Sequence, residues 1–296
     1  MLTSDLLQQS AAQLSKAGVS SPEVDSELLA AHILGITRSE LSVAIAMDSE
    51  FPEDKIGTFS DGISRRANRE PLQHITGQAP FRHLELAVGK GVFTPRPETE
   101  QVVSFAMEKI ASFESPVIVD LCAGSGAIAL SFATERPDAK VYAVEKSQEA
   151  FEFLKQNSNK YGLDLGQLSK VDLQDCLTEM ESVADLVISN PPYIPNGSIP
   201  VDLEVQLHEP AISLYGGVDG LDVIRQILSK AKQLLRAGGL LVLEHADTQA
   251  VSIRELLLAE GWISLDSKKD LAGKDRMISA TKPKQKQKGD VSAANL

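Results

Sequence analysis

An alternation of strand-like and helix-like segments begins at Val117 and runs almost to the end of the 296-residue chain. Short apolar runs bounded by turns are typical of buried strands, and here most are followed by a segment with helical periodicity. Such an alternation requires a parallel sheet with helices on both faces. We therefore predict an α/β fold with seven strands, at residues 117–121, 141–144, 167–171, 185–189, 240–245, 262–265 and 276–280.

The first 70 residues have a different pattern, that of short helices with clear ends. Ser21-Pro22 is a typical helix start, Thr37 and Glu40 form a capping box, and a further helix is predicted from Pro52 to Asn68. These signals predict a small helical bundle. Residues 1–80 carry 11 Asp and Glu against 6 Lys and Arg, so the bundle is not a nucleic-acid arm. Docking a protein partner and bracing the next domain fit these residues equally well.

Residues 71–97 are predicted to form a hairpin-bearing linker, because short β-like runs at 84–88 and 91–93 lie among glycines and prolines. The prolines of the segment 94–100 are expected to prevent a helix until Glu98. Four residues here are candidates to line a site, although the two acids also suit the first turn of a helix. They are Arg96, Glu98, Thr99 and Glu100.

The turn after the first predicted strand is rich in small residues and leads into a helix. Gly124 and Gly126 let the backbone approach a ligand at that helix N-terminus. Glu145 ends the second strand about twenty residues later, a spacing at which a carboxylate accepts ribose hydroxyls. Asp172 follows the third strand and is a candidate for the adenine edge, or else an ordinary turn residue. The pattern indicates a nucleoside-bearing cofactor, and a nicotinamide enzyme remains open.

The stretch Asn190-Pro-Pro-Tyr193 follows the fourth strand, which its two prolines end abruptly. Asn190 is thereby placed at the carboxyl end of a strand, where ligands bind in open α/β sheets. The Asn190 side-chain carbonyl and the Pro191 main-chain carbonyl are two acceptors beside an aromatic ring. This arrangement suits a planar NH₂ group. His245, at another strand end, is more often a structural histidine than a catalytic one.

The formal net charge of −12 argues against a protein that holds nucleic acid by neutralising phosphates. The two cysteines, Cys122 and Cys176, are far apart, so neither a disulfide framework nor a metal site is indicated. We expect no metal. The sequence has no basic leader followed by an apolar core and no long apolar run. We expect a cytoplasmic protein, without a membrane or direct nucleic-acid partner, that works as a monomer.

Together these motifs resemble the HemK/PrmC family of peptide chain release factor N5-glutamine methyltransferases, over nearly the whole chain. The resemblance implies a Rossmann-like seven-stranded S-adenosylmethionine-dependent fold with its last strand antiparallel, preceded by the helical bundle. It implies methylation of the glutamine in the Gly-Gly-Gln motif of release factors, which the bundle helps to grip. The matching segments are Pro71–Gly77, Pro95–Glu100, Asp120–Leu130, Ser189–Pro195, Glu209–Ala211, Gly217–Asp222 and Glu244-His245.

The resemblance and the residue patterns together give three sets of expected site residues. Catalysis is assigned to Asn190, Pro191 and Tyr193, and substrate binding to these with Pro192. Cofactor binding is assigned to Cys122, Ala123, Gly124, Ser125, Gly126, Glu145, Asp172, Leu173 and Asn190. Many relatives have Gly-Thr in place of Cys122-Ala123, a glycine in place of Ala246 and a tryptophan in place of Leu173. With Leu173, adenine is expected to lie on an aliphatic side chain.

The expected domains are a release-factor-docking bundle at 1–70, the hairpin linker at 71–97, the methyltransferase domain at 98–281 and a disordered tail at 282–296. Three other functions stay open. The strongest is methylation of an exocyclic amine of a nucleic-acid base, because the same two acceptors would serve. A non-catalytic binding protein and a nicotinamide oxidoreductase follow.

Overall fold

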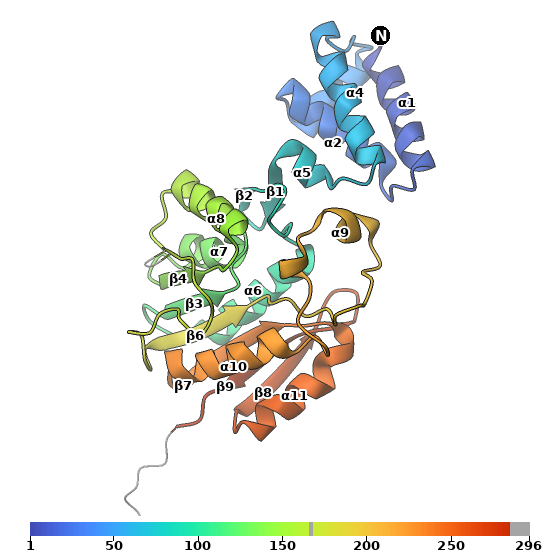
Figure 1. Ribbon diagram of the computed structural model, residues 1–296. Helices are drawn as coiled ribbons and strands as arrows, with labels where there is room; N and C mark the ends of the chain where they lie inside the picture. Colours follow the sequence, from blue (N-terminus) through green and yellow to red (C-terminus); the bar gives the residue numbers. More distant parts are fainter. Residues whose placement is uncertain (166–167, 285–296) are drawn as a thin grey trace, which may run out of the picture. The chain divides into compact units, whose positions relative to one another are not determined.

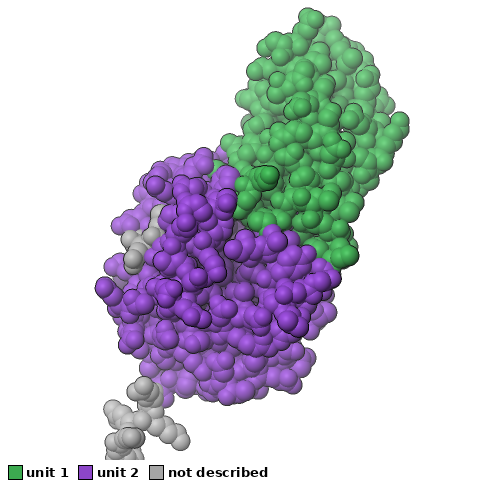
Figure 2. Space-filling model, in the orientation of Figure 1, with its two compact units in different colours: residues 1–79, 87–94, 199–210 green, residues 80–86, 95–198, 211–296 purple. Residues whose placement is uncertain are grey.

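The computed structural model describes residues 1–165 and 168–284, which form two compact units (Figure 2). The helical unit comprises Met1–Ala79, Ala87–Thr94 and Ile199–Pro210. The sheet unit comprises Pro80–Leu86, Pro95–Ser198 and the chain from Ala211 onward. The segment Ile199–Pro210 therefore leaves the sheet unit just after the Asn-Pro-Pro-Tyr turn and returns to it at Ala211. We call this segment the strap.

The helical unit is built on a core of leucine, isoleucine and phenylalanine side chains. Leu14, Leu41 and Phe59 are fully buried, and the rings of Phe51 and Phe59 lie 5.3 Å apart. The predicted capping box at Thr37 is confirmed. The helices are α1 Thr3–Lys16, α2 Pro22–Leu34, α3 Arg38–Ala46, α4 Glu53–Ala67, α5 Leu72–Thr76 and, in the strap, α9 Leu203–His208.

Two helices of this unit were not predicted, and one predicted β-like run is wrong. The short helix α5 begins after Pro71 and ends at Gly77 in the left-handed conformation, a start and stop that the sequence does contain. The helix α9 lies in a stretch that reads as a polar loop. Residues 91–93 are not a strand, because a glycine turn joins the Val92 N–H to the Gly89 carbonyl. Strand β2 (Leu84–Ala87) pairs instead with β1 (Gln78–Phe81).

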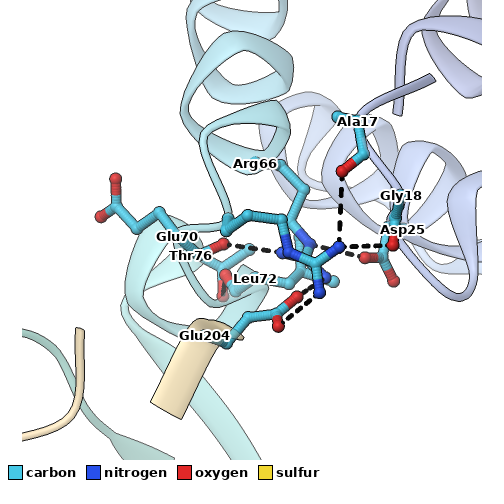
Figure 3. Close-up of polar contacts among 9 residues, drawn as sticks. Ala17, Gly18, Asp25, Arg66, Glu70, Leu72, Thr76 and Glu204 are labelled. Carbon is cyan, nitrogen blue, oxygen red and sulfur yellow. Dashed lines mark hydrogen bonds and ion pairs between the residues drawn. The ribbon is translucent and has the colours of Figure 1, made fainter. Parts of the chain in front are cut away.

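A buried ion cluster fastens the strap within the helical unit (Figure 3). The Glu204 carboxylate accepts hydrogen bonds from Arg66 at 2.9 Å and from Arg69 at 2.6 Å. Arg66 also donates to Asp25 at 2.7 Å, and its side chain is only 8% exposed. At the other end of the strap, the Glu209 carboxylate accepts from the Thr94 main-chain N–H. The strap is thus held at two points by carboxylates.

The sheet unit contains seven strands in the order β5-β4-β3-β6-β7-β9-β8 (Figure 1). Neighbours from β5 to β7 are parallel, while β9 is antiparallel to both β7 and β8. The predicted seven-stranded sheet with an antiparallel last strand is therefore confirmed. The strands are β3 Val117–Leu121, β4 Lys140–Val144, β5 Leu168–Ser169, β6 Ala184–Ser189, β7 Leu235–Glu244, β8 Ile263–Lys269 and β9 Asp275–Thr281.

Helices α10 and α11 pack on one face of this sheet, and α6 and α7 lie behind it in Figure 1. The first face carries alternate residues of β3, namely Val119 and Leu121, together with Val187 of β6. Helix α6 begins at Pro97 rather than Glu98, since proline at the first helical position has no N–H to lose. The helices are α6 Pro97–Lys109, α7 Ala127–Glu135, α8 Gln148–Tyr161, α10 Asp222–Leu234, α11 Ala250–Ala259, and the short 3₁₀ turns Ala211–Ser213 and Asp247–Gln249.

The last strands reach beyond their predicted limits. Strand β7 begins at Leu235 rather than Leu240 and takes in both glycines of its leading turn, with a register shift opposite Ala184. Lys282 still bonds to the Gly239 carbonyl beyond the end of β9. The predicted tail from residue 285 and the predicted strand residue Gln167 lie outside the described residues. No single helix in the described ranges is long and apolar enough to cross a membrane; α2 and α3 pass that test only as a pair bent by 98°.

Candidate active site

The candidate site lies where the order of the sheet reverses. From β3 the chain adds β4 and β5 on one side, and then β6 and β7 on the other. In open α/β sheets ligands bind at this switch point, beyond the carboxyl ends of the strands. Leu121 and Ser189, the last residues of β3 and β6, are paired in register, and the Ser189 hydroxyl donates to the Leu121 carbonyl. The glycine turn and the Asn-Pro-Pro-Tyr turn therefore begin side by side.

The turn after β3 brings together the five consecutive residues predicted to hold the cofactor. Cys122 has a left-handed φ of 63°, and the Ala123 N–H donates to the Val144 carbonyl at 2.9 Å. Gly126 has a φ of 88°, and a Cβ there would lie 2.6 Å from the Leu154 side chain. The Ser125 carbonyl accepts from the buried amide of Asn157 at 2.9 Å. Burial also raises the pKa of the Cys122 thiol, which is therefore neutral.

Glu145 meets this turn directly. One carboxylate oxygen accepts from the Gly124 N–H at 2.8 Å, and the other accepts from the Ser147 N–H at 2.7 Å. A carboxylate offers about four acceptor positions, so each oxygen keeps capacity for a ligand hydroxyl. Burial raises the pKa of Glu145 despite these hydrogen bonds. The spacing seen in the sequence thus corresponds to a real contact between the second strand and the glycine turn.

Asp120 is a residue of this site that the sequence reasoning did not single out. It is fully buried one residue before the end of β3, and its Oδ2 accepts from the Ala129 N–H at 3.0 Å. Its other oxygen, Oδ1, is buried without a hydrogen-bond partner among the described residues. Burial raises its pKa well above the usual range. An acid inside an otherwise apolar strand was the available signal.

Asp172 and Leu173, two further residues predicted to bind the cofactor, follow strand β5. Asp172 lies three residues beyond β5 and pairs with Lys146 at 2.5 Å, with both side chains more than half exposed. This ion pair places Asp172 beside Lys146, which directly follows Glu145 in the chain. Leu173 is half-buried and packs against the apolar core of the sheet unit.

Asn190 is held by a residue from a distant helix. Its side-chain NH₂ donates to the Thr99 hydroxyl at 3.0 Å, and that hydroxyl donates to Glu244 at 2.7 Å. Among the described residues, neither the Asn190 side-chain oxygen nor the Pro191 carbonyl accepts a hydrogen bond. Both predicted acceptors thus remain available.

Tyr193 is half-buried, and its main chain is fixed by residues from elsewhere in the sheet unit. The Tyr193 carbonyl accepts from Gln249 at 2.8 Å. Gly220 has a φ of 76°, and a Cβ there would lie 2.3 Å from the same carbonyl. Ile194 continues the contact through main-chain hydrogen bonds with Leu214 and Gly216. The loop from Leu214 to Gly220, together with Gln249, therefore supports the Asn-Pro-Pro-Tyr turn.

The other candidates separate into different roles. Thr99 reaches Asn190, whereas Glu100 accepts from the Arg82 N–H at 3.0 Å. Arg96 is the residue before the first turn of α6. The His245 ring is fully buried; its Nδ1 lies 2.8 Å from the Ala246 carbonyl, and burial lowers its pKa. Its Nε2 is buried without a hydrogen-bond partner among the described residues. No group of three potential metal ligands occurs within residues 1–165 and 168–284.

A seven-stranded sheet with an inserted antiparallel strand, a glycine turn after its first strand and an Asn-Pro-Pro-Tyr turn after its fourth define an S-adenosylmethionine-dependent methyltransferase. Residues 5–77 match the family described as PrmC N-terminal domain, and residues 84–215 match the Methyltransferase small domain. The hMettl16 catalytic domain, solved with the MAT2A 3′UTR hairpin 6, has the same fold: its TM-score is 0.55 at 16% identity, over 75% of this chain and 82% of that one.

Closer relatives identify the family. The release factor glutamine methyltransferase of Streptomyces coelicolor is 43% identical over 93% of this chain and 96% of its own length. Those of Mycolicibacterium smegmatis and Deinococcus radiodurans are 42% and 36% identical, each over 93% of this chain and over 96% and 97% of their own lengths. The chain belongs to the release factor glutamine methyltransferase family.

Proposed function

We propose that this protein transfers a methyl group from S-adenosylmethionine to the side-chain amide nitrogen, N5, of the glutamine in the Gly-Gly-Gln motif of peptide chain release factors. One observation carries the proposal: two unoccupied carbonyl acceptors, on Asn190 and Pro191, lie together at the switch point beside the glycine turn. A primary amide has two N–H groups and needs two acceptors.

The residues around the glycine turn fit the cofactor. Asp120 and Glu145 are buried acids, both with a raised pKa, and the Asp120 Oδ1 has no partner among the described residues. Two such acids suit a ligand that carries an ammonium and a sulfonium group. Glu145 retains acceptor positions for ribose hydroxyls, and a Cβ at Gly124 would have nothing within 4 Å, so the backbone is open to a ligand there. When bound, S-adenosylmethionine supplies an electrophilic methyl group.

Orientation is the main task of this chain's own residues. An amide nitrogen is a poor nucleophile, because its lone pair is delocalised into the carbonyl. Correct placement of two reactants can supply roughly 7–11 kcal/mol of a barrier, against roughly 3–4 kcal/mol for one polar group. We propose that Asn190 and Pro191 accept the two substrate N–H bonds and stabilise the positive charge that grows on nitrogen. Tyr193 packs the amide plane and excludes water. No base is required before transfer, since the methylated amide sheds its proton afterwards.

The helical unit is proposed to dock the release factor. Its acidic balance favours a protein over a nucleic acid, and residues 5–77 match a domain that accompanies this family. We further propose that the protein acts as a monomer in the cytoplasm, where release factors work. A sedimentation measurement of the active protein tests the first point.

The function is tested by transfer of labelled methyl from S-adenosylmethionine to purified release factor. Two matched samples are a release factor whose Gly-Gly-Gln glutamine is changed to alanine, and total RNA. We expect label on the intact factor alone. Label on RNA alone would replace the proposal with methylation of a base amine, and label on the altered factor would move the target to another residue.

A further inference from the structure

Behind the Asn-Pro-Pro-Tyr turn lies a buried carboxylate that the mechanism above does not use. Glu244 is the last residue of β7 and is 2% exposed. Its Oε2 accepts a hydrogen bond of 2.7 Å from the hydroxyl of Thr99, in the first turn of α6. Thr99 is also buried. Burying a carboxylate beside a neutral hydroxyl costs free energy, so the position of Glu244 needs an explanation.

The hydrogen bond from Thr99 to Glu244 determines which group donates in the hydrogen bond between Thr99 and Asn190. A hydroxyl has one hydrogen and two lone pairs, and an ionised carboxylate can only accept. Thr99 therefore gives its hydrogen to Glu244 and offers a lone pair to Asn190. Asn190 must face Thr99 with its NH₂ group, as it does at 3.0 Å. If the Asn190 side-chain amide were flipped by 180°, its carbonyl oxygen would face the Thr99 lone pair, so two acceptors would meet. Its NH₂ would then face the NH₂ of the substrate, so two donors would meet.

Other side chains also face Glu244. Tyr193, in the turn after β6, and Arg276 of β9 lie close enough to affect its charge, and so does Glu98 of α6. Arg276 favours the charged carboxylate, and Glu98 opposes it. These contacts come from α6, β7, β9 and the turn after β6, and all lie in the sheet unit.

We propose that Glu244 and Thr99 are positioning residues for amide methylation: through Thr99, Glu244 sets which way the Asn190 side-chain amide faces. This inference rests on the proposed function. Neither residue needs to touch the substrate. Their loss leaves the cofactor and substrate contacts in place, but removes the bias that keeps the Asn190 oxygen toward the substrate.

Two substitutions of Thr99 give the first test, with kcat and KM measured on release factor. Thr99→Val removes the hydroxyl and keeps the shape, and we expect kcat to fall about 10- to 100-fold, the range for losing a hydrogen bond linked to a charged group. KM for S-adenosylmethionine should change less than about threefold. Thr99→Ser keeps the hydroxyl and should restore most of kcat. Thr134→Val is the matched control, since among the described residues that hydroxyl bonds only to the Leu130 carbonyl.

A double-variant comparison separates positioning from general packing. If Thr99 acts through Asn190, then Thr99→Val should have little further effect on single-turnover rates in an Asn190→Ala background. Equal falls in both backgrounds would overturn the proposal. So would Thr99→Val as active as Thr99→Ser.

Glu244→Gln provides a test that does not depend on the Thr99 variants folding. Gln can present either an oxygen or an NH₂ to Thr99, so the direction of the hydrogen bonds from Thr99 to Asn190 is no longer fixed. We expect kcat to fall, and the wild-type dependence of kcat on pH near neutrality to flatten. An unchanged kcat and pH profile would contradict the proposal. Wild-type enzyme is run throughout. If it does not label release factor, the proposed function fails, whereas normal wild-type activity together with variants as active as wild type refutes only this inference.

Discussion

Glu204 and Glu244 are both largely buried carboxylates, one in each unit, and their surroundings are opposite. Glu204 is paired with the guanidinium groups of Arg66 and Arg69, whereas Glu244 accepts its hydrogen bond from the neutral hydroxyl of Thr99. Burial acts to raise the pKa of both. For Glu204, the hydrogen bonds from Arg69, from its own main chain and from Arg66 together outweigh burial and lower the pKa, while the pKa of Glu244 is raised to about 7.

The difference shows how partners decide what a buried acid can do. A carboxylate paired with cations stays charged and fastens two segments, as Glu204 fastens the strap. A carboxylate that accepts from a hydroxyl fixes the direction in which that hydroxyl points its hydrogen, and the charge of the carboxylate is sensitive to pH near neutrality. We therefore expect changes around Glu204 to affect stability, and changes around Glu244 to affect turnover.

The largest expected effect is on catalysis, from Asn190→Ala. Losing one well-placed acceptor in a transition state costs about 100- to 1000-fold in kcat. Binding of S-adenosylmethionine, measured by calorimetry, should weaken far less, because the Glu145 contacts remain. The control is Asn159→Ala, at an exposed position of α8. Turnover near the wild-type level would remove Asn190 from the mechanism.

The corresponding change in the helical unit is Arg66→Met. It leaves Asp25 unpaired and Glu204 with Arg69 alone, which should lower the free energy of unfolding by about 3 kcal/mol. Urea unfolding followed by circular dichroism measures this. Arg38→Met breaks the exposed pair with Glu27 and should cost less than about 1 kcal/mol. Equal losses in the two variants would contradict the account of the cluster.

A third prediction concerns the pH dependence of stability in Glu244→Gln. The folded pKa of Glu244, about 7, lies above the ordinary value of 4.5, so the folded state binds the proton more tightly. Its contribution to stability is present below pH 4.5 and is lost as pH rises to 7, by about 3 kcal/mol. Relative to wild type, Glu244→Gln should therefore gain stability over this window. Parallel stability curves for the two proteins would show that Glu244 titrates normally.

The smallest expected effect has the opposite sign and comes from Glu204→Gln. Because the pKa of Glu204 is lowered, its contribution is present above pH 4.5 and is lost as pH falls through the folded value. The variant should match wild type most closely in acid and be slightly less stable at pH 7. Urea unfolding at several pH values measures both. A variant that loses more stability in acid than at pH 7 would reverse the sign.

The sequence predicted the parts of this molecule that rest on local patterns. The strand and turn signals from Val117 onward are local, and so is the capping box at Thr37. The antiparallel position of β9 came from family resemblance, because nothing in that strand specifies its neighbours. Helix α9 was missed because it has only six residues, and it belongs to the helical unit through contacts of Glu204 with residues about 135 positions earlier.

The candidate site was predictable only in part, for the same reason. Glu145 could be linked to the glycine turn by a spacing that recurs in nucleoside-binding folds. The bond from Thr99 to Glu244 joins residues 145 positions apart, and no pattern along the chain pairs them. Thr99 was a candidate by its place in a motif, but its role depends on where β7 ends.

The most direct test of the central claim is to find the methyl group by tandem mass spectrometry of release factor treated with wild-type enzyme or with Asn190→Ala. The account predicts one methyl on the side-chain nitrogen of the Gly-Gly-Gln glutamine with the wild type, and almost none at equal times with the variant. A methyl group on any other residue, or the same yield from both enzymes, would contradict it.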